Sequence, residues 1–412
     1  MTAEPRIAPQ AWMTAPETRA VVAALTARGA AVRFVGGCVR DALAGRPIKD
    51  IDLATPLKPE QVIALLEAAG LKAIPTGLAH GTVTAVAEGK SFEITTLRID
   101  VEPLGRHAKV AFTDDWQADA ARRDFTINAL SCEPDGRLHD PFGGRADLEA
   151  GRIRFVGAAR QRIEEDHLRL LRFFRFQAHY GKAPLDAEGL AAATDAAPLL
   201  AKLSGERIRA ELFTLLGAPD PVVVVGVMIE QKILAAVLPE ITDGAALAAL
   251  LRLETEPDAL RRLAALLPPD PALAKGLAER LRLSNAEAAR LGALLDLPKD
   301  TDWWEARALR RSVYQRGAAT VTDQLLLDQA RGLAAGQAAE PEEFSSALQE
   351  VGNWQPKVFP LKGRDVLALD VADGPEVGRL LRLVEAWWID EDFSPDRAAC
   401  LAQLKEMAEA ST

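Results

Sequence analysis

The sequence predicts an α/β head followed by a mostly α-helical neck, body and tail. From about residue 30 to residue 140, short β-branched runs alternate with glycine turns and helical segments, as in a mixed α/β domain. Beyond about residue 150 strand patterns largely disappear, and Ala- and Leu-rich helical segments continue to the end. We therefore predict a head over residues 1–145, a neck over 146–215, and a body and tail over 216–412.

Length and proline placement support this division. A chain of 412 residues exceeds what one core usually supports, so roughly two to four domains are expected. Within the helical part, Pro268–Pro271 carries three prolines in four residues and is a clear helix breaker. No internal sequence repeat of fixed length is evident.

Cysteine usage and hydropathy exclude several protein classes. Cys38, Cys132 and Cys400 are odd in number and widely scattered, which argues against a disulfide framework and for a reducing cytoplasm. Residues 1–16 lack the pattern of a secretory signal, and the longest apolar stretch, around 222–229, is too short to span a bilayer. We therefore expect a cytoplasmic protein with no membrane partner.

Net charge gives a mixed signal about nucleic acid. The overall value of −10 is not the footprint of a nucleic-acid binder. Residues 151–211, however, hold eleven Arg and Lys against eight Asp and Glu, which leaves a local excess of +3. A basic strip on an acidic body suits brief engagement of RNA that weakens as salt rises.

The first element with chemical meaning is a glycine pair after a short apolar strand that includes Phe34 and Val35. Gly36 and Gly37 allow a tight turn and close backbone approach, and a helix beginning near Val39 would offer unpaired N–H groups. Such groups attract phosphate, and Arg40 adds a forked cation. Alone, a glycine pair is more often a turn than a phosphate cradle.

Asp50 and Asp52 follow about a dozen residues later. In a strand, residues i and i+2 project from one face, so the two carboxylates would converge while Ile51 faces the core. Carboxylate oxygens are the ligands that Mg²⁺ prefers, and two such ions can stabilise the attacking and leaving oxygens of a phosphoryl transfer. An isolated Asp-x-Asp would more often be an exposed turn. Next to the glycine pair, it predicts a triphosphate site facing a metal site.

These residues, with later segments, resemble the motifs of the class II tRNA nucleotidyltransferase and bacterial poly(A) polymerase family. Five ordered matches cover roughly the N-terminal half and are far more specific than any single one. In order they are Gly36–Asp41 with Asp50–Thr55, Arg122–Leu130, Asp140–Gly144, Glu165–Arg172 and Ser204–Ile208. The resemblance implies a small nucleotidyltransferase sheet of the polymerase-beta type in the head.

The resemblance also implies roles for individual residues. Asp50 and Asp52 would bind the catalytic Mg²⁺ ions, while Gly37 and Arg40 would hold the nucleotide phosphates. The full set of implied nucleotide-binding residues is Gly36, Gly37, Arg40, Asp41, Arg123, Asp124, Asn128, Asp166, Arg169, Arg172 and Arg175. Glu93, in a β-branched run that reads as a strand, is a third candidate metal ligand, although an outward-facing strand Glu is nearly as good an interpretation.

The fourth motif predicts how the base is read. Asp166, Arg169, Arg172 and Arg175 recur every three residues in a segment with helical apolar periodicity, so they would form a slowly winding polar stripe. In the family, the residues matching Asp166 and Arg169 read the Watson–Crick edge of CTP or ATP, which replaces a nucleic-acid template. The alternative is an ordinary i,i+3 ion pair on an exposed helix.

The implied activity is template-independent addition of CCA to the tRNA 3′ end from CTP and ATP. The stretch Gly105–Lys109 resembles the flexible loop of enzymes that add the terminal A, which favours complete CCA synthesis. No obligate protein partner is evident. Two alternatives stay open: a poly(A) polymerase, which would share every catalytic motif, and a tRNA-binding protein with a degenerate active site.

Overall fold

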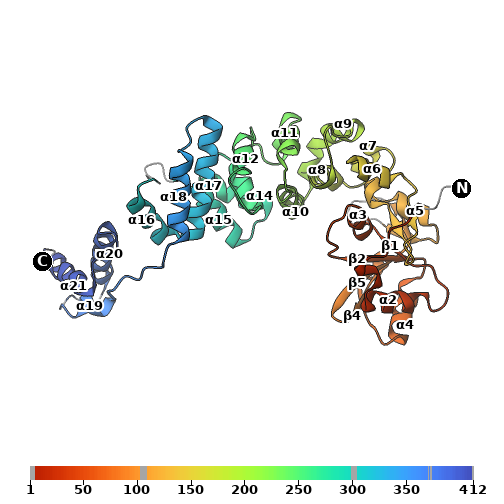
Figure 1. The fold of residues 1–412 in the computed structure, drawn as a ribbon, viewed down its shortest axis with the longest axis horizontal. Coiled ribbons are helices and arrows are strands. Elements are labelled where there is room, and N and C mark those ends of the chain that lie inside the picture. Colours follow the sequence, from red (N-terminus) through yellow and green to blue (C-terminus); the bar gives the residue numbers. More distant parts are fainter. Residues whose placement is uncertain (1–4, 103–108, 298–303, 370, 372–373, 411–412) are drawn as a thin grey trace. The chain divides into compact units, whose positions relative to one another are not determined.

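The computed structural model describes residues 5–102, 109–297, 304–369, 371 and 374–410 (Figure 1). The chain divides into two compact units, Met1–Thr242 and Asp243–Thr412. The predicted boundaries near residues 145 and 215 both fall inside the first unit and stay predictions. Most of the Gly105–Lys109 loop lies outside the described residues.

The first unit is built on a mixed seven-stranded sheet with the order β3-β4-β5-β2-β1-β8-β9. Only β2 and β5 are parallel neighbours, and the other adjacent pairs are antiparallel. A separate two-stranded sheet joins β6 (Arg98–Glu102) to β7 (Lys109–Phe112). The strands of the large sheet are β1 (Arg33–Val35), β2 (Ile51–Thr55), β3 (Lys72–Gly77), β4 (Thr82–Ala87), β5 (Lys90–Thr96), β8 (Ser131–Cys132) and β9 (Leu138–His139).

The sheet forms because its strands alternate apolar and polar residues. In β4 the buried residues Val83 and Ala85 are fully inaccessible, while Thr82 and Thr84, which alternate with them, are partly exposed. Helices α2 (Pro16–Thr26) and α4 (Pro59–Ala68) contact β4, and α4 also contacts β3 and β5 (Figure 1). Their apolar residues share one core with Leu53, Phe92 and Ile94 of β2 and β5, which leaves the other face of these strands available for polar side chains.

Helices complete the first unit. A short helix, α3 (Gly37–Leu43), joins β1 to β2; α1 (Ala11–Thr14) precedes α2 and α5 (Trp116–Ala121) follows β7. The later helices are α6 (Gly144–Ala150), α7 (Ala159–Glu165), α8 (Leu168–Tyr180), α9 (Ala187–Ala196), α10 (Gly205–Leu216) and α11 (Val222–Glu230). The predicted change from mixed to helical structure is therefore confirmed.

Helix α8 is anchored to the strand-bearing part of the unit by aromatic packing. The Phe125 ring lies 5.2 Å from the Phe176 ring, and the Phe155 ring lies 5.6 Å from the Phe173 ring, measured between centroids. Phe125, Phe155 and Phe173 are at least 98 % buried. Offset and edge-on aromatic pairs of this kind add to the gain from burial. The cluster fixes α8 at the edge of the cavity described below.

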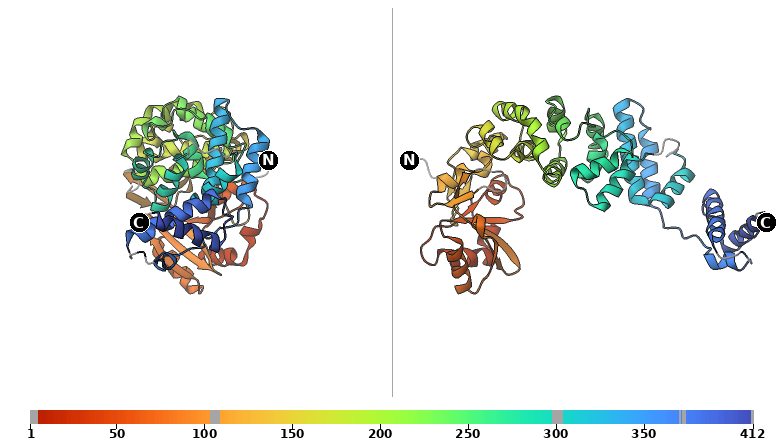
Figure 2. Two further views of the ribbon diagram at one scale, coloured as in Figure 1. Left: turned by 90° about the vertical axis from the view of Figure 1, so that its left-hand side faces the viewer. Right: turned by 180° about the vertical axis from the view of Figure 1, so that it is seen from behind.

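The second unit contains helices joined by loops, with no strand among its described residues. In the reverse view of Figure 2, strands are confined to the red, orange and yellow part of the ribbon. The helices are α12 (Ala245–Leu250), α13 (Ala259–Leu266), α14 (Leu273–Leu281), α15 (Asn285–Leu295), α16 (Ala306–Arg316), α17 (Ala318–Ala335), α18 (Pro341–Gly352), α19 (Gly363–Leu367), α20 (Pro375–Asp390) and α21 (Arg397–Glu409). Pro268–Pro271 separates α13 from α14, so the predicted helix break is confirmed.

Buried ion pairs tie three helices of the second unit together. Glu254 accepts from Arg261 at 2.7 Å and from Arg262 at 2.6 Å. Asp323 on α17 accepts from Arg261 at 2.9 Å and from Arg290 on α15 at 2.7 Å. Arg262 is 2 % exposed, so it and Glu254 are satisfied by one another rather than by bulk water, whereas the Arg290 side chain is 40 % exposed. No helix among the described residues has the length and apolar content needed to cross a bilayer.

Candidate active site

One cavity of about 940 Å³ in the first unit gathers every residue predicted from the sequence to bind metal or nucleotide, whereas the third motif, Asp140–Gly144, does not line it. It is lined by residues from β1, α3, β2, β5, α8 and α10, together with the segments that follow α5 and α7. The predicted residues on its wall are Gly36, Gly37, Arg40, Asp41, Asp50, Asp52, Glu93, Arg123, Asp124, Asn128, Asp166, Arg169, Arg172 and Arg175. Segments that lie more than 100 residues apart in the sequence therefore meet at one place.

The acidic part of the cavity lies on β2 and β5, the parallel strand pair of the seven-stranded sheet. Asp52 on β2 is in register with Glu93 on β5, and Asp50 directly precedes β2. Burial, and then the charges of Glu93 and Asp50, raise the pKa of Asp52 to about 6, although Arg123 opposes the rise. Asp50 and Asp52 thus share one cavity instead of pointing to opposite surfaces, and Glu93 faces it with them.

This donor set fits a divalent cation. The three side chains offer only carboxylate oxygens, and their mutual repulsion is what a bound cation would relieve. Among the described residues no group of three or more His, Cys, Asp or Glu side chains is arranged to hold a metal ion by itself, so these carboxylates would share a cation with other ligands. An open set suits Mg²⁺, which usually keeps several waters and takes one or two carboxylates plus substrate phosphates.

The glycine pair lies between two guanidinium groups. Gly36 has φ of +68°, and a Cβ there would lie 2.9 Å from Arg123 Nη1. A Cβ on Gly37 would lie 3.7 Å from Arg40 Nη2. Helix α3 begins at Gly37, two residues earlier than predicted, so the pair forms its first turn. The lack of a side chain at Gly36 lets Arg123 lie against the backbone, whereas a Cβ on Gly37 would make only an ordinary van der Waals contact with Arg40.

A chain of hydrogen bonds connects this cradle to α8. Arg40 Nη1 donates to Asn128 Oδ1 at 2.6 Å, Asn128 Nδ2 donates to Asp124 Oδ1 at 2.9 Å, and Arg172 Nε donates to Asp124 Oδ2 at 2.7 Å. Burial alone would raise the pKa of Asp124, but Arg172 and the bond from Asn128 hold it below the ordinary value. Asp124 and Asn128 therefore orient their neighbours, and their predicted contacts with a nucleotide stay predictions.

The base-reading motif differs from the predicted stripe at its first member. Asp166 has φ of −150° and lies in the break between α7 and α8, so the prediction of one helical stripe is wrong at this position. The break occurs because Asp166 Oδ1 accepts from the Leu168 backbone N–H at 3.1 Å, which a helical Asp could not do. The other three members lie on α8 as predicted.

The predicted alternative, an i,i+3 ion pair between Asp166 and Arg169, does not form. Arg207 Nη2 on α10 instead donates to both oxygens of Asp166, at 2.8 and 3.0 Å. Arg169 pairs with Glu165 at 2.5 Å and donates to the Arg122 carbonyl oxygen at 3.1 Å. Asp166 and Arg169, the two residues predicted to read the base, are thus each paired with another side chain, and both line the cavity.

The remaining arginines of the motif are paired with an acid that the sequence did not indicate. Glu211 on α10 lies 3.1 Å from Arg175 Nε and 3.8 Å from Arg172 Nη1. Burial raises the pKa of Glu211, and the two guanidinium groups oppose that rise. Arg172 and Arg175 therefore join α8 to α10 in addition to facing the cavity.

Several residues that line the cavity were not predicted. Arg207 belongs to the fifth motif but received no role from the sequence. Arg46, Lys49 and Tyr180 also line the cavity, and neither spacing nor composition distinguishes Arg46 or Tyr180. Only Lys49, next to Asp50, carried a positional signal that could have been used.

Comparison with known proteins agrees with this site. The model of the poly A polymerase head domain matches residues 32–154, and the model described as the probable RNA and SrmB- binding site of polymerase A matches residues 184–244. The mitochondrial CCA tRNA nucleotidyltransferase 1 of Mus musculus is 35% identical over 397 residues, covering 91% of this chain and 86% of the relative. The chain belongs to the CCA tRNA nucleotidyltransferase family. The family predicted from the motifs is thereby confirmed, and the chain is an enzyme of the transferase class.

Other members of the CCA tRNA nucleotidyltransferase family are similar in sequence or in fold. The CCA-adding enzyme of Geobacillus stearothermophilus is 42% identical over 205 residues, which is 49% of this chain and 50% of that enzyme. The crystal structure of the Bacillus stearothermophilus CCA-adding enzyme in complex with CTP superposes with a TM-score of 0.74 at 27% identity, covering 96% of this chain and 98% of that one. A Thermotoga maritima CCA-adding enzyme complexed with tRNA shares the fold, with a TM-score of 0.65 at 19% identity.

Proposed function

We propose that this enzyme adds C, C and A to the 3′ end of tRNA, from CTP and ATP and without a nucleic-acid template. The observation that carries the proposal is the shared cavity: acidic groups, a glycine cradle between two guanidinium groups, and a carboxylate–guanidinium pair line the same wall. Those are the parts needed to hold a triphosphate, its metal and its base. Relatives named for CCA addition support the same activity.

Asp50 and Asp52, with Glu93 beside them, would hold Mg²⁺ in this proposal. When bound, Mg²⁺ supplies positive charge that stabilises the attacking and leaving oxygens of nucleotidyl transfer. The carboxylates bring the required negative charge. The raised pKa of Asp52 means that burial and the neighbouring carboxylates destabilise its ionised form, which a bound cation would stabilise. The chemistry needs no covalent bond between enzyme and nucleotide.

The basic side chains of the cavity would bind and orient the nucleotide. Arg40 and Arg123 lie against Gly36 and Gly37, where they can donate to triphosphate oxygens. Asp50 and Asp52 line the same cavity, so in this proposal the α-phosphate of a bound triphosphate would face them. The tRNA 3′ hydroxyl would attack at this point and pyrophosphate would leave.

Asp166 and Arg169 would select the base. Cytosine and adenine each carry an exocyclic amine next to an unprotonated ring nitrogen, whereas guanine and uracil carry a carbonyl next to a protonated one. A carboxylate accepts from the amine and a guanidinium donates to the ring nitrogen, so one pair of side chains can accept C and A and reject G and U. Holding the pair in place, as Arg207 and Glu165 do, limits adaptation to the wrong base.

The helical part of the chain would bind the tRNA body. We retain the predicted division into a head over 1–145, a neck over 146–215, and a tRNA-binding body and tail over 216–412. The family model for a probable RNA-binding site, which matches residues 184–244, supports RNA contact near the junction of neck and body. We also propose the cytoplasm as the compartment, since Cys38, Cys132 and Cys400 are free and buried.

Product sequencing tests the proposed function. Purified enzyme is incubated with Mg²⁺ and a tRNA lacking its 3′ CCA, and receives CTP, ATP or both. We expect two C residues from CTP alone and complete CCA from the mixture. A poly(A) polymerase would instead make long A tracts from ATP and add no C, and a degenerate protein would add nothing. Asp50→Ala should abolish incorporation while the circular dichroism spectrum is unchanged; retained activity would contradict the assigned site.

A further inference from the structure

Tyr180 occupies a position that the base and metal assignments do not explain. It is the last residue of α8, and its hydroxyl group donates to Asp41 Oδ1 at 2.7 Å. The same oxygen accepts from Arg40 Nε at 2.9 Å. Burial, and the acceptor Asp41, raise the pKa of Tyr180, so the hydroxyl keeps its proton and acts as the donor. One oxygen atom of Asp41 therefore accepts hydrogen bonds both from Tyr180 on α8 and from Arg40, the proposed phosphate ligand.

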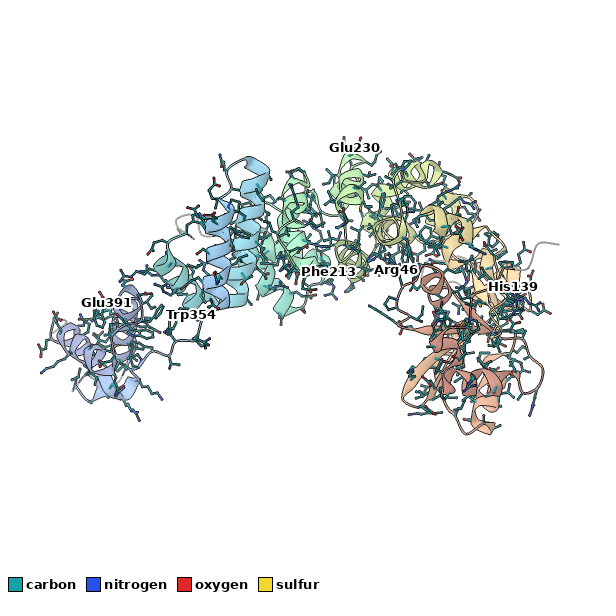
Figure 3. All side chains as sticks on the ribbon, viewed as in Figure 1. Arg46, His139, Phe213, Glu230, Trp354 and Glu391 are labelled. Carbon is teal, nitrogen blue, oxygen red and sulfur yellow. The ribbon has the colours of Figure 1, made fainter. Side chains whose placement is uncertain are left out.

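Two guanidinium groups also pack against the Tyr180 ring. The Arg40 Cζ atom lies 4.4 Å from the ring centroid, and the Arg46 Cζ atom lies 4.1 Å from it. Arg46, labelled in Figure 3, lies in the segment between α3 and β2 and donates to the His179 carbonyl oxygen near the end of α8. The Arg46 backbone N–H donates to the Asp41 carbonyl oxygen at 2.8 Å. The end of α8 and the end of α3 are thus joined through ring, side chain and backbone.

Helix α8 consequently holds Arg40 by two independent routes. One route passes from Arg172 through Asp124 and Asn128 to Arg40 Nη1, by the hydrogen bonds given above. The other runs from Tyr180 to Arg40, through its ring and through Asp41. A guanidinium fixed at several of its nitrogens loses little freedom when a triphosphate binds, so its contribution to binding is larger.

We propose that Tyr180 is a positioning residue: it sets the orientation of Arg40 toward the triphosphate and couples the base-reading helix α8 to the phosphate cradle. This proposal rests on the proposed function of the cavity. It predicts that Tyr180 affects binding of CTP and ATP equally, because the phosphates are common to both. The choice of C and A over U and G stays with Asp166 and Arg169.

Steady-state kinetics of Tyr180→Phe test the hydroxyl separately from the ring. With tRNA in excess, we expect the KM for CTP and for ATP to rise by about tenfold, the loss typical of one hydrogen bond to a charged group. We expect kcat to change much less, and the discrimination against UTP to stay constant. Tyr180→Leu, which also removes the ring from Arg40 and Arg46, should raise both KM values further.

Calorimetric titration with CTP and Mg²⁺ supplies a readout that needs no turnover. The dissociation constant should rise by the same factor as KM. Tyr314→Phe is a matched control, because Tyr314 also donates to a carboxylate, Glu385 Oε1 at 2.5 Å, but lies in the second unit. In this titration, which contains no tRNA, it should leave the dissociation constant of CTP unchanged.

A double-mutant cycle with Asp41→Asn tests whether the Tyr180 hydroxyl acts on Arg40 through Asp41. If the hydroxyl acts through Asp41, adding Tyr180→Phe to Asp41→Asn should cause little further increase in KM. Full additivity would overturn this route. Wild-type KM and dissociation constant in Tyr180→Phe, or a lowered melting temperature without a change in KM, would overturn the proposal. Failure of the wild-type enzyme to add C would instead contradict the proposed function.

Discussion

Replacement of Asp52 by Asn should make the enzyme inactive and more stable. The carboxyl group of Asp52 has a pKa near 3.8 in an unfolded chain and of about 6 in the folded protein, chiefly because it is buried and next because Glu93 lies beside it. Since one pKa step is worth about 1.4 kcal/mol, its ionised form costs the metal-free fold roughly 3 kcal/mol at neutral pH. Asn removes that charge with little change in shape.

The sign and the pH range of this effect follow from the two pKa values. Between pH 3.8 and about 6 the folded protein binds the extra proton, so stability falls as the pH rises and then stays level above about 6. The gain from Asp52→Asn should therefore be full at pH 7.5 and about half as large at pH 5. For a unit of 242 residues, roughly 3 kcal/mol corresponds to a rise in Tm of about 6 to 12 °C, taken as an upper bound.

Thermal denaturation followed by circular dichroism measures this directly. Wild type, Asp52→Asn and the control Asp114→Asn, an exposed acid outside the cavity, are compared in EDTA at pH 7.5 and pH 5. Added Mg²⁺ should raise the Tm of wild type and have little effect on Asp52→Asn. An equal or lower Tm for Asp52→Asn at pH 7.5 would refute the view that Asp52 is held ionised at a cost.

Two further substitutions test other parts of the cavity. Gly36→Ala should raise the KM for both nucleotides about tenfold in steady-state assays, because its Cβ would lie 2.9 Å from Arg123 Nη1 and its φ is +68°. Gly89→Ala, with φ of +79° and no neighbour within 4 Å, should alter stability alone, and an equal KM effect there would contradict the reasoning. Arg207→Gln should free Asp166 and raise incorporation of U and G, read by product sequencing, by about tenfold. Arg160→Gln, from an exposed ion pair with Glu164, should not, and unchanged fidelity in Arg207→Gln would argue against control of Asp166 by Arg207.

The fold class, the glycine pair and the acidic pair followed from local patterns, whereas most other residues of the cavity were implied by the resemblance to the family. A strand, two glycines and a helix place Gly36 and Gly37 where the structure has them, and period-two spacing brings Asp50 and Asp52 together. Helical periodicity beyond residue 150 is likewise a property of neighbouring residues. Such features depend only on residues within one helix or strand, so they can be predicted from the sequence.

The pairings across the cavity could not be predicted, because they join residues far apart in sequence. Arg207 bonds to Asp166, 41 positions away, and Tyr180 bonds to Asp41, 139 positions away. Nothing near Glu211 indicates that it meets Arg175. The break at Asp166 was missed for a related reason: apolar periodicity runs through it, and only the bond to the Leu168 N–H shows that the helix restarts there.

The buried ion pairs of the second unit restrict how its helices can be arranged. Glu254 and Asp323 together engage Arg261, Arg262 and Arg290, so sliding α13 past α17 by one turn would strand several charges in an apolar interior. Loss of one partner from such a group costs about 3 to 5 kcal/mol, while replacement of the whole group by apolar residues can be neutral. The ion pairs therefore favour one alignment of the helices over others. Substitution of one of these residues should be tolerated only when its partners are replaced as well.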